Sequence, residues 1–248
     1  LGIGVIGLAH YFAKKGLKYE EAADLTHELM EAFQYYLIDA SADLASEIGP
    51  CSAYHETKYA KGLLPIDHYK KEVDSVAAPK YNLDWEALRA KVATHGVRNS
   101  TLSAQMPSES SSVVCNATNG IEPPRDYLSI KKSKKGTLKQ IVPGYPRLKN
   151  NYTLLWDMKS MDGYLNVMAV IQKFFDQSIS TNTSYNPQHF EGKEVPASVL
   201  MGDLLKSYKL GIKTLYYQNT YDGKGEEEIV KEEPTPSIDD LLELGDEA

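Results

Sequence analysis

A run of hydroxyl side chains follows a proline near the middle of the chain. It consists of Pro107, Ser108, Glu109, Ser110 and Ser111. Proline has no N–H to donate to a strand ladder, and the small polar residues after it favour an exposed turn that begins a helix. The first turn of a helix has unpaired N–H groups and a positive dipole end, which bind phosphate together with serine hydroxyls. The alternative is an ordinary helix N-cap in a serine-rich loop.

Two adjacent tyrosines, Tyr216 and Tyr217, could support a different kind of chemistry. They lie in residues 212–219, a short β-rich run that follows a helix and the helix-ending Gly211. Aromatic side chains are common in strands, so the pair needs no functional explanation. A phenol can also give up both an electron and a proton, so neighbouring tyrosines can pass an oxidising equivalent through a protein. The residues alone leave both interpretations open.

Other reactive side chains form weaker patterns. Cys51 and His55 could make a nucleophilic pair, but closeness in sequence is not closeness in a site. His27 and Glu28 are expected on a helix surface, and we predict no metal site because no second histidine stands at ligand spacing. The glycine-rich start, GIGVIG, has no preceding strand, so it is expected to allow close backbone packing and not to bind a dinucleotide.

Composition limits the class of protein. The 248 residues carry a formal net charge of -7, which argues against a general nucleic-acid binder. No apolar run is long enough to span a bilayer, and no secretory signal is evident. The two cysteines, Cys51 and Cys115, lie far apart, so no disulfide framework is expected and the predicted location is the cytoplasm.

Apolar periodicity predicts helices that alternate with short strands, which is typical of an α/β fold. The expected helices span residues 20–48, 85–95, 162–180 and 199–208. The expected strands cover residues 97–102, residues 212–219 and a hairpin over 127–142 with a lysine-rich, solvated tip. The first helix has a predicted buried stripe of Leu25, Leu29, Phe33, Leu37, Ala40, Leu44 and Ile48. In the last helix Leu200, Leu204 and Leu205 are expected to point inward.

Several motifs together resemble one family. They are MPSESSS, NATNGIEPPR, FDQSISTNTSY, LYYQN and the segment TKYAKGLLPIDHYKKEV. They resemble the carboxy-terminal part of the large (α, catalytic) subunit of class I ribonucleotide reductase. Over residues 1–221 the resemblance implies the second half of a ten-stranded α/β barrel with outer helices. Residues 222–248 are acidic and interrupted by proline, and are expected to form a flexible tail.

The resemblance also implies a function. Members of the family make deoxyribonucleotides for DNA synthesis from ribonucleoside diphosphates by thiyl-radical chemistry. Residues 107–111 would hold the substrate diphosphate, with Ser110 standing where the family more often has threonine. Tyr216 and Tyr217 would relay the oxidising equivalent from the radical-bearing small subunit to an active-site cysteine.

The resemblance implies partners and no cofactor bound by this chain. A metal-containing small (β) subunit would supply the radical, and an external dithiol such as thioredoxin or glutaredoxin would supply electrons. The catalytic cysteines would come from an amino-terminal part of the α subunit, so this chain alone is expected to be inactive. It starts at Leu1 inside an apolar element, which suggests a fragment, a processed product or a separately encoded half. No membrane or nucleic-acid partner is expected.

The acidic tail departs from the family pattern. Family members usually end in a cysteine pair that passes electrons inward, whereas no cysteine follows Cys115 here. This difference leaves an alternative, a degenerate non-catalytic module for nucleotide binding or assembly. The intact LYYQN motif argues against the alternative, because a module that only binds nucleotides has no use for a tyrosine relay.

Overall fold

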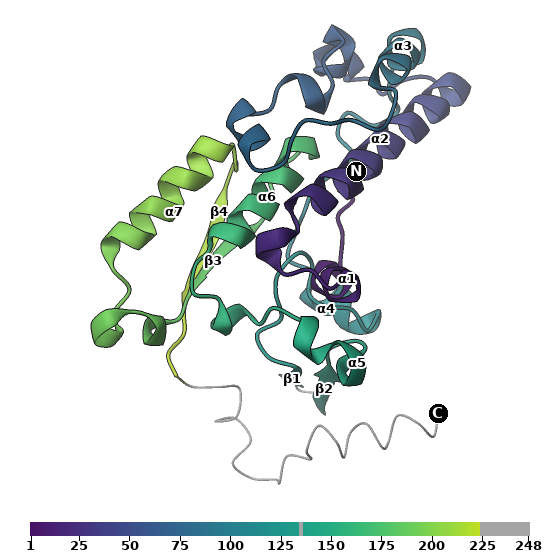
Figure 1. Cartoon of the computed structure of the whole chain (residues 1–248). Helices are drawn as coiled ribbons and strands as arrows, with labels where there is room; N and C mark the ends of the chain where they lie inside the picture. The colour runs from purple at the N-terminus through teal and green to yellow at the C-terminus, as the bar shows by residue number, and fades with distance from the viewer. Residues whose placement is uncertain (134–135, 224–248) are drawn as a thin grey trace.

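The computed structural model describes residues 1–133 and 136–223 (Figure 1). The predicted tail, residues 222–248, lies outside the described residues apart from Asp222 and Gly223. The predicted hairpin tip includes residues 134–135, which also lie outside them. Helices and short strands alternate along the chain, as the α/β prediction requires.

The fold is built around α6, Asp162–Phe174, which is buried on almost every side (Figure 1). The long α2, Ala23–Ile48, packs against α6, and α3, Trp85–His95, packs against α2. On another side of α6 lies α7, Ala197–Leu210. The short α1, Leu8–Lys15, adds Phe12 and other apolar side chains to the same core. Each large apolar side chain buried in this way contributes about 1.5–3 kcal/mol to stability.

The predicted helix over residues 162–180 is too long. Helix α6 ends at Phe174, and Phe175 is already in an extended conformation. The Gln172 side chain then folds the following turn, because its Nε2 donates to Gln177 O at 2.8 Å and its Oε1 accepts from Ile179 N at 3.3 Å. Local hydrogen bonds of the Gln172 side chain therefore replace the backbone hydrogen bonds with which the helix would continue.

Parallel strands begin after this turn. Strand β3, Thr181–Tyr185, pairs in parallel with β4, Leu215–Thr220, which confirms a strand at the tyrosine pair. The strand predicted over residues 97–102 is wrong, because none of these residues lies in a strand. Pairing begins just after them, as single parallel bridges from Ser103 to Ile3 and from Gln105 to Ile179. Here the Asp176 carboxylate accepts from Leu102 N at 2.8 Å and occupies a backbone group that a ladder would use.

These bridges and strands place four chain segments side by side in the order of the sequence. Residue 3 lies beside residues 103–105, these lie beside residue 179 and β3, and β3 lies beside β4, all in parallel. Parallel neighbours in chain order, connected through helices, are the arrangement of α/β barrels. The described residues form mixed helices and strands without closing a barrel.

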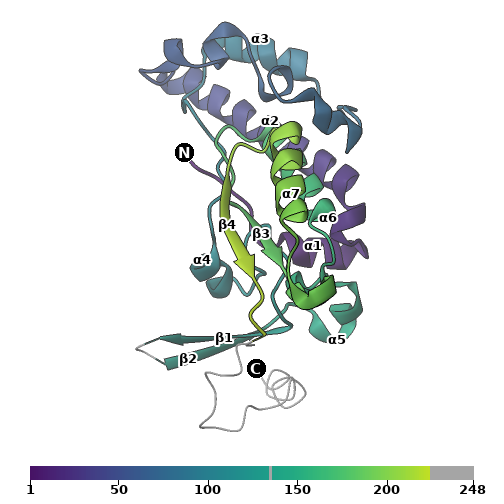
Figure 2. The same cartoon turned by 90° about the vertical axis from the view of Figure 1, so that its left-hand side faces the viewer.

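The predicted hairpin is confirmed. Strands β1, Leu128–Ser133, and β2, Gly136–Ile141, pair antiparallel, with Leu128 opposite Ile141. The hairpin extends away from the helices (Figure 2). Two short helices lie near it in the chain, α4, Glu109–Val114, and α5, Tyr145–Leu148.

The buried face of α2 differs from the predicted apolar stripe. Leu44 and Ile48 are exposed, whereas His27 and Glu31 are buried, so the predicted surface position of His27 is wrong. The buried polar side chains have partners in neighbouring elements. Trp85 Nε1 donates to Glu31 Oε1 at 3.1 Å, and His27 Nε2 lies 3.0 Å from Lys173 Nζ. The buried face of α2 therefore combines apolar residues such as Met30 and Ile38 with polar side chains that have specific partners.

The predicted inward face of α7 is confirmed for Leu200, which packs against the core, but it is wrong for Leu204 and Leu205. Leu204 and Leu205 are 49% and 60% exposed. The buried positions are instead Asp203, Ser207 and Leu210, and Tyr185 OH donates to Asp203 Oδ2 at 2.9 Å. A hydrogen-bonded polar face therefore turns toward β3, which apolar periodicity could not reveal.

Candidate functional site

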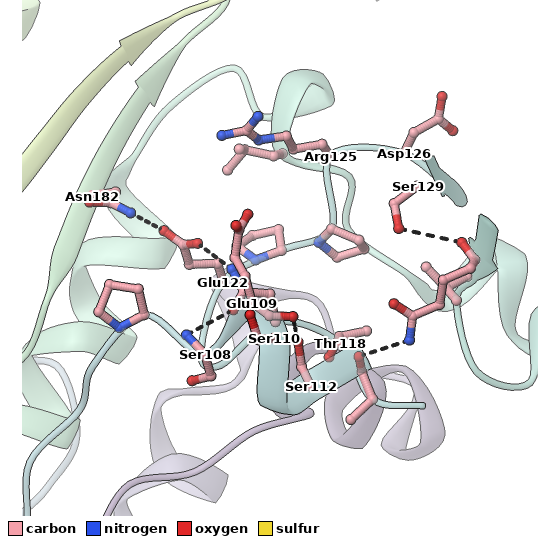
Figure 3. Close-up of a pocket in the computed structure, with 18 of the residues that line it drawn as sticks. Ser108, Glu109, Ser110, Ser112, Thr118, Glu122, Arg125, Asp126, Ser129 and Asn182 are labelled. Atoms are coloured by element: carbon pink, nitrogen blue, oxygen red, sulfur yellow. Dashed lines mark hydrogen bonds between the residues drawn. The ribbon is translucent and has the colours of Figure 1, made fainter. Parts of the chain in front are cut away.

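A cavity of about 700 Å³ brings the serine loop and the tyrosine pair together. Figure 3 shows the serine-loop side of this cavity, with Ser108, Ser110 and Glu122 labelled. Its walls come from residues 107–112, 117–119 and 122–126, the base of the β1–β2 hairpin and strands β3 and β4. All the predicted site residues line it: Pro107, Ser108, Glu109, Ser110, Ser111, Tyr216 and Tyr217. Residues more than a hundred positions apart in the sequence thus share one space.

The serine loop begins α4 as the sequence predicts, and Ser108 is the residue before its first turn. Most of its hydroxyls hold the loop itself, since Ser108, Ser111 and Ser112 donate to backbone carbonyls at 3.1–3.2 Å. Among the described residues, the Ser110 hydroxyl has no intramolecular partner. Helix α4 has only 6 residues and hence a small dipole, so first-turn N–H groups and Ser110 are the main donors it offers an anion.

A second turn, which contains Thr118 and Gly120, packs against the serine loop. Gly120 has φ 47° and sits so close that a Cβ there would lie 3.2 Å from Ser108 Oγ. Gly7 N donates to Thr118 O at 2.9 Å and Leu8 N to Gly120 O at 3.1 Å, which ties this turn to the start of α1. The glycine at position 120 therefore allows the two turns to approach each other.

The tyrosine pair lies at a β-bulge. Thr181 pairs with Leu215 and Thr183 with Gln218, so the single residue Asn182 stands opposite both Tyr216 and Tyr217. Successive side chains of a regular strand point to opposite faces, and an extra residue breaks this alternation. The ring centroids of Tyr216 and Tyr217 are accordingly only 4.3 Å apart.

Both tyrosines are accessible, Tyr216 at 53% and Tyr217 at 58% exposure. The Tyr217 O–H donates a hydrogen bond to the neighbouring phenol of Tyr216, which raises the pKa of Tyr217. Asn182 Oδ1 accepts from Tyr217 N at 3.0 Å and satisfies the backbone group that the bulge removes from the ladder. The arrangement presents two touching phenols at the cavity wall.

Glu122 is a site residue to which the sequence assigned no role. Its carboxylate accepts from Asn182 Nδ2 at 2.5 Å and from Asn119 Nδ2 at 3.3 Å (Figure 3). Burial raises the pKa of Glu122, while the Asn182 hydrogen bond and the Arg125 guanidinium oppose that rise. The quoted motif NATNGIEPPR contains Asn119 and Glu122, but nothing in its spacing pointed to a partner on a strand that far along the chain.

Other candidates stay outside the cavity. Cys51 is half-buried, His55 is exposed, and neither they nor Cys115 line the cavity wall. Across residues 1–133 and 136–223, no group of His, Cys, Asp and Glu side chains is arranged to hold a metal ion. No helix in the same ranges combines the length and apolar character needed to cross a membrane.

Comparison with known protein families decides the family. Residues 1–218 match the family described as "Ribonucleotide reductase, barrel domain". The chain belongs to this family. The match includes both the serine loop and the tyrosine pair, so the cavity lies within the family's barrel domain.

Individual relatives agree with this assignment. The chain is 56% identical over 242 residues to "Ribonucleoside-diphosphate reductase 1 subunit alpha" of Escherichia coli (strain K12), covering 97% of this chain and 31% of the relative. It is 58% identical over 225 residues to the subunit alpha of Haemophilus influenzae, covering 90% and 30%. The subunit alpha of Enterobacteria phage T4 is 47% identical over 242 residues, covering 97% and 32%. The chain thus spans roughly a third of the length of these relatives.

Proposed function

We propose that this chain is the part of a ribonucleoside-diphosphate reductase α subunit that holds the substrate diphosphate and carries the tyrosine relay. The single observation that carries the proposal is the cavity, which joins the serine loop and the tyrosine pair in one space. The names of the relatives support the reaction class, reduction of ribonucleoside diphosphates. A module that only binds nucleotides would not need a bulge that brings two phenols together.

The serine loop would bind the diphosphate. Its first-turn N–H groups have no intrahelical partners, and the Ser110 hydroxyl is available to a ligand. Charge-assisted hydrogen bonds to an anion are about twice as strong as neutral ones. Glu109 begins the same turn, so the amides and hydroxyls of the loop must outweigh its charge.

The tyrosine pair would carry the oxidising equivalent. Rings whose centroids lie 4.3 Å apart are close enough for an electron and a proton to pass from one phenol to the other. The exposure of both rings suits a pathway that enters from a partner and leaves toward a catalytic thiol. The thiol would lose an electron and a proton to the tyrosine pair, and the resulting thiyl radical would abstract a hydrogen atom from the ribose, after which the 2′-hydroxyl takes up a proton and leaves as water.

The missing components would come from other parts of the enzyme. This chain has two cysteines, both outside the cavity, so the reactive thiols would lie in a further part of the α subunit. A metal-containing β subunit would supply the radical, and a dithiol reductant of the thioredoxin or glutaredoxin type would supply the electrons, in the cytoplasm. The parallel order of segments 3, 103–105, 179–185 and 215–220 supports one half of a ten-stranded barrel.

Tyr217→Phe tests the relay in the enzyme assembled from this chain, the remaining part of the α subunit and the β subunit. The phenylalanine keeps the ring but loses the O–H, so we expect turnover to fall to background while binding of CDP is unchanged. Tyr221→Phe is the matched control, since Tyr221 contacts Trp156 and does not line the cavity. Turnover retained by Tyr217→Phe would remove the relay from the proposed function.

A further inference from the structure

A chain of hydrogen bonds connects the serine loop with the tyrosine bulge. It starts at Ser108 N, which donates to Asn119 Oδ1 at 3.2 Å. Asn119 Nδ2 then donates to one oxygen of Glu122, and Asn182 Nδ2 donates to the other. It ends where Asn182 Oδ1 accepts from Tyr217 N at 3.0 Å. Glu122 is the midpoint of this chain.

The two ends of this series of hydrogen bonds require that Glu122, at its centre, is an ionised carboxylate. Each asparagine must turn its oxygen toward a backbone N–H, one at Ser108 and the other at Tyr217. Both NH₂ groups therefore face Glu122, which has to accept from two sides. Among side chains only a carboxylate accepts equally at two neighbouring oxygens. An amide or a protonated carboxyl would place a donor against a donor.

We propose that Glu122 is a positioning residue that couples the diphosphate loop to the tyrosine pair by hydrogen-bonding Asn119 and Asn182 through its two oxygens. This inference rests on the proposed function of the cavity and adds a coupling between its two parts. Neither asparagine needs to touch substrate for the coupling to operate.

The coupling has a direct geometric basis. Substrate phosphate bound at the first turn of α4 would tighten the loop that begins at Ser108. Through Asn119 and Glu122 this would fix Asn182, and with it the bulge that sets the contact between the two phenols. Coupling between two sites is reciprocal for binding, so disturbing the bulge should also weaken diphosphate binding.

A double-mutant cycle in the assembled enzyme tests the proposal, with CDP as the probe. Asn119→Ala should mainly raise KM, by about fivefold, because it releases the loop. Asn182→Ala should mainly lower kcat, by about tenfold, because it releases the bulge. In the double variant the loss in kcat/KM should be well below the product of the single losses, since either change already breaks the connection. Losses that multiply to within about twofold would overturn the coupling.

Glu122→Gln tests the midpoint directly and should change both KM and kcat. Glu28→Gln is the matched control. Glu28 is exposed on α2 and does not line the cavity, so this substitution removes the same charge at another place. Wild-type kinetics for Glu122→Gln would overturn the proposal. If Glu122→Gln fails to fold in a thermal unfolding measurement, the asparagine cycle still decides.

Different experiments test the tyrosine relay and the role of Glu122. Loss of turnover in Tyr217→Phe together with normal kinetics in the network variants would reject only the role of Glu122. Full turnover in Tyr217→Phe would reject the relay itself.

Discussion

At the scale of single residues, the core contains an ammonium group with a full set of partners. The buried Lys173 Nζ lies 3.0 Å from His27 Nε2, 3.1 Å from Asp74 Oδ1 and 4.3 Å from the ring centroid of Tyr69. Burial lowers the pKa of Lys173, and burial and then the nearby Lys173 charge lower the pKa of His27. The neutral imidazole can accept from the ammonium, whereas an imidazolium would repel it.

This cluster predicts acid sensitivity. In the unfolded chain His27 binds a proton below about pH 6.5, but in the folded chain its pKa is lower, so the unfolded state gains protons first. The free energy of unfolding should therefore fall as the pH drops below about 6.5. We expect His27→Gln, whose Oε1 can accept from Lys173, to flatten that fall in urea unfolding at pH 5.5 and 7.5. The exposed His55→Gln is the control, and an equally steep fall in both variants would contradict the prediction.

A second residue-scale prediction concerns Ser110. Its hydroxyl is the one in the serine loop that is left for a ligand, whereas the hydroxyls of Ser108, Ser111 and Ser112 hold the loop. A hydrogen bond to a charged group contributes about 1.5–3 kcal/mol, so Ser110→Ala should raise KM for CDP by at least about tenfold. Ser110→Thr keeps the hydroxyl and should be tolerated. Steady-state kinetics check both, with Ser46→Ala on α2 as the control, and an unchanged KM in Ser110→Ala would exclude the contact.

At the scale of elements, close contacts hold the central helix in place. A Cβ at Gly163, near the start of α6, would lie 2.8 Å from backbone atoms of Glu20. Backbone cannot rotate aside as a side-chain end can. The 3-10 turn Tyr19–Glu21 and α6 therefore depend on a residue without a side chain at their contact.

The contact gives a paired prediction about stability. Gly163→Ala should lower the free energy of unfolding by about 1–3 kcal/mol, because the methyl group forces the two elements apart. Gly202→Ala, inside α7, has nothing within 4 Å of its Cβ and should raise that free energy by about 0.5–1 kcal/mol through helix propensity. Chemical denaturation of both variants checks the sign. Equal effects would show that the close contact carries no energy.

At the scale of the whole molecule, the cavity exists because parallel segments bring distant residues to one place. The serine loop follows the bridge at Gln105, Asn182 is in β3, and the tyrosines are in β4, which lies beside it. Figures 1 and 2 show these strands beside the helical core, with the hairpin reaching past them. The cavity wall includes no cysteine.

Because neither Cys51 nor Cys115 lines the cavity, this chain has no thiol that could become a thiyl radical beside the substrate. We therefore predict that this chain on its own reduces no ribonucleoside diphosphate. Turnover should appear only when the remaining part of the α subunit, the β subunit and a dithiol are added. Product analysis by chromatography checks each omission. Deoxynucleotide formed by the chain alone would show that the reactive thiol has been wrongly placed.

The sequence by itself determined the features that local rules govern. Asp84 caps α3 by accepting from Ala87 N at 2.9 Å, Gly96 ends that helix, and the predicted bounds 85–95 are confirmed. The β1–β2 hairpin and the helix start at the serine loop were also predicted from their own residues. The family was evident from several motifs, each of which is a short stretch of the chain.

Only the tertiary structure decided the features that need partners far along the chain. The turn after α6 is held by the hydrogen bonds that the Asp176 carboxylate accepts from Leu102 N and Ser103 N. The polar inner faces of α2 and α7 have partners on other elements, and Glu122 meets Asn182 across 60 residues. Such hydrogen bonds have no periodicity in the sequence, because a buried polar group needs one partner at one place and not a repeating pattern. The bulge that joins the two tyrosines likewise exists only when β3 lies beside β4.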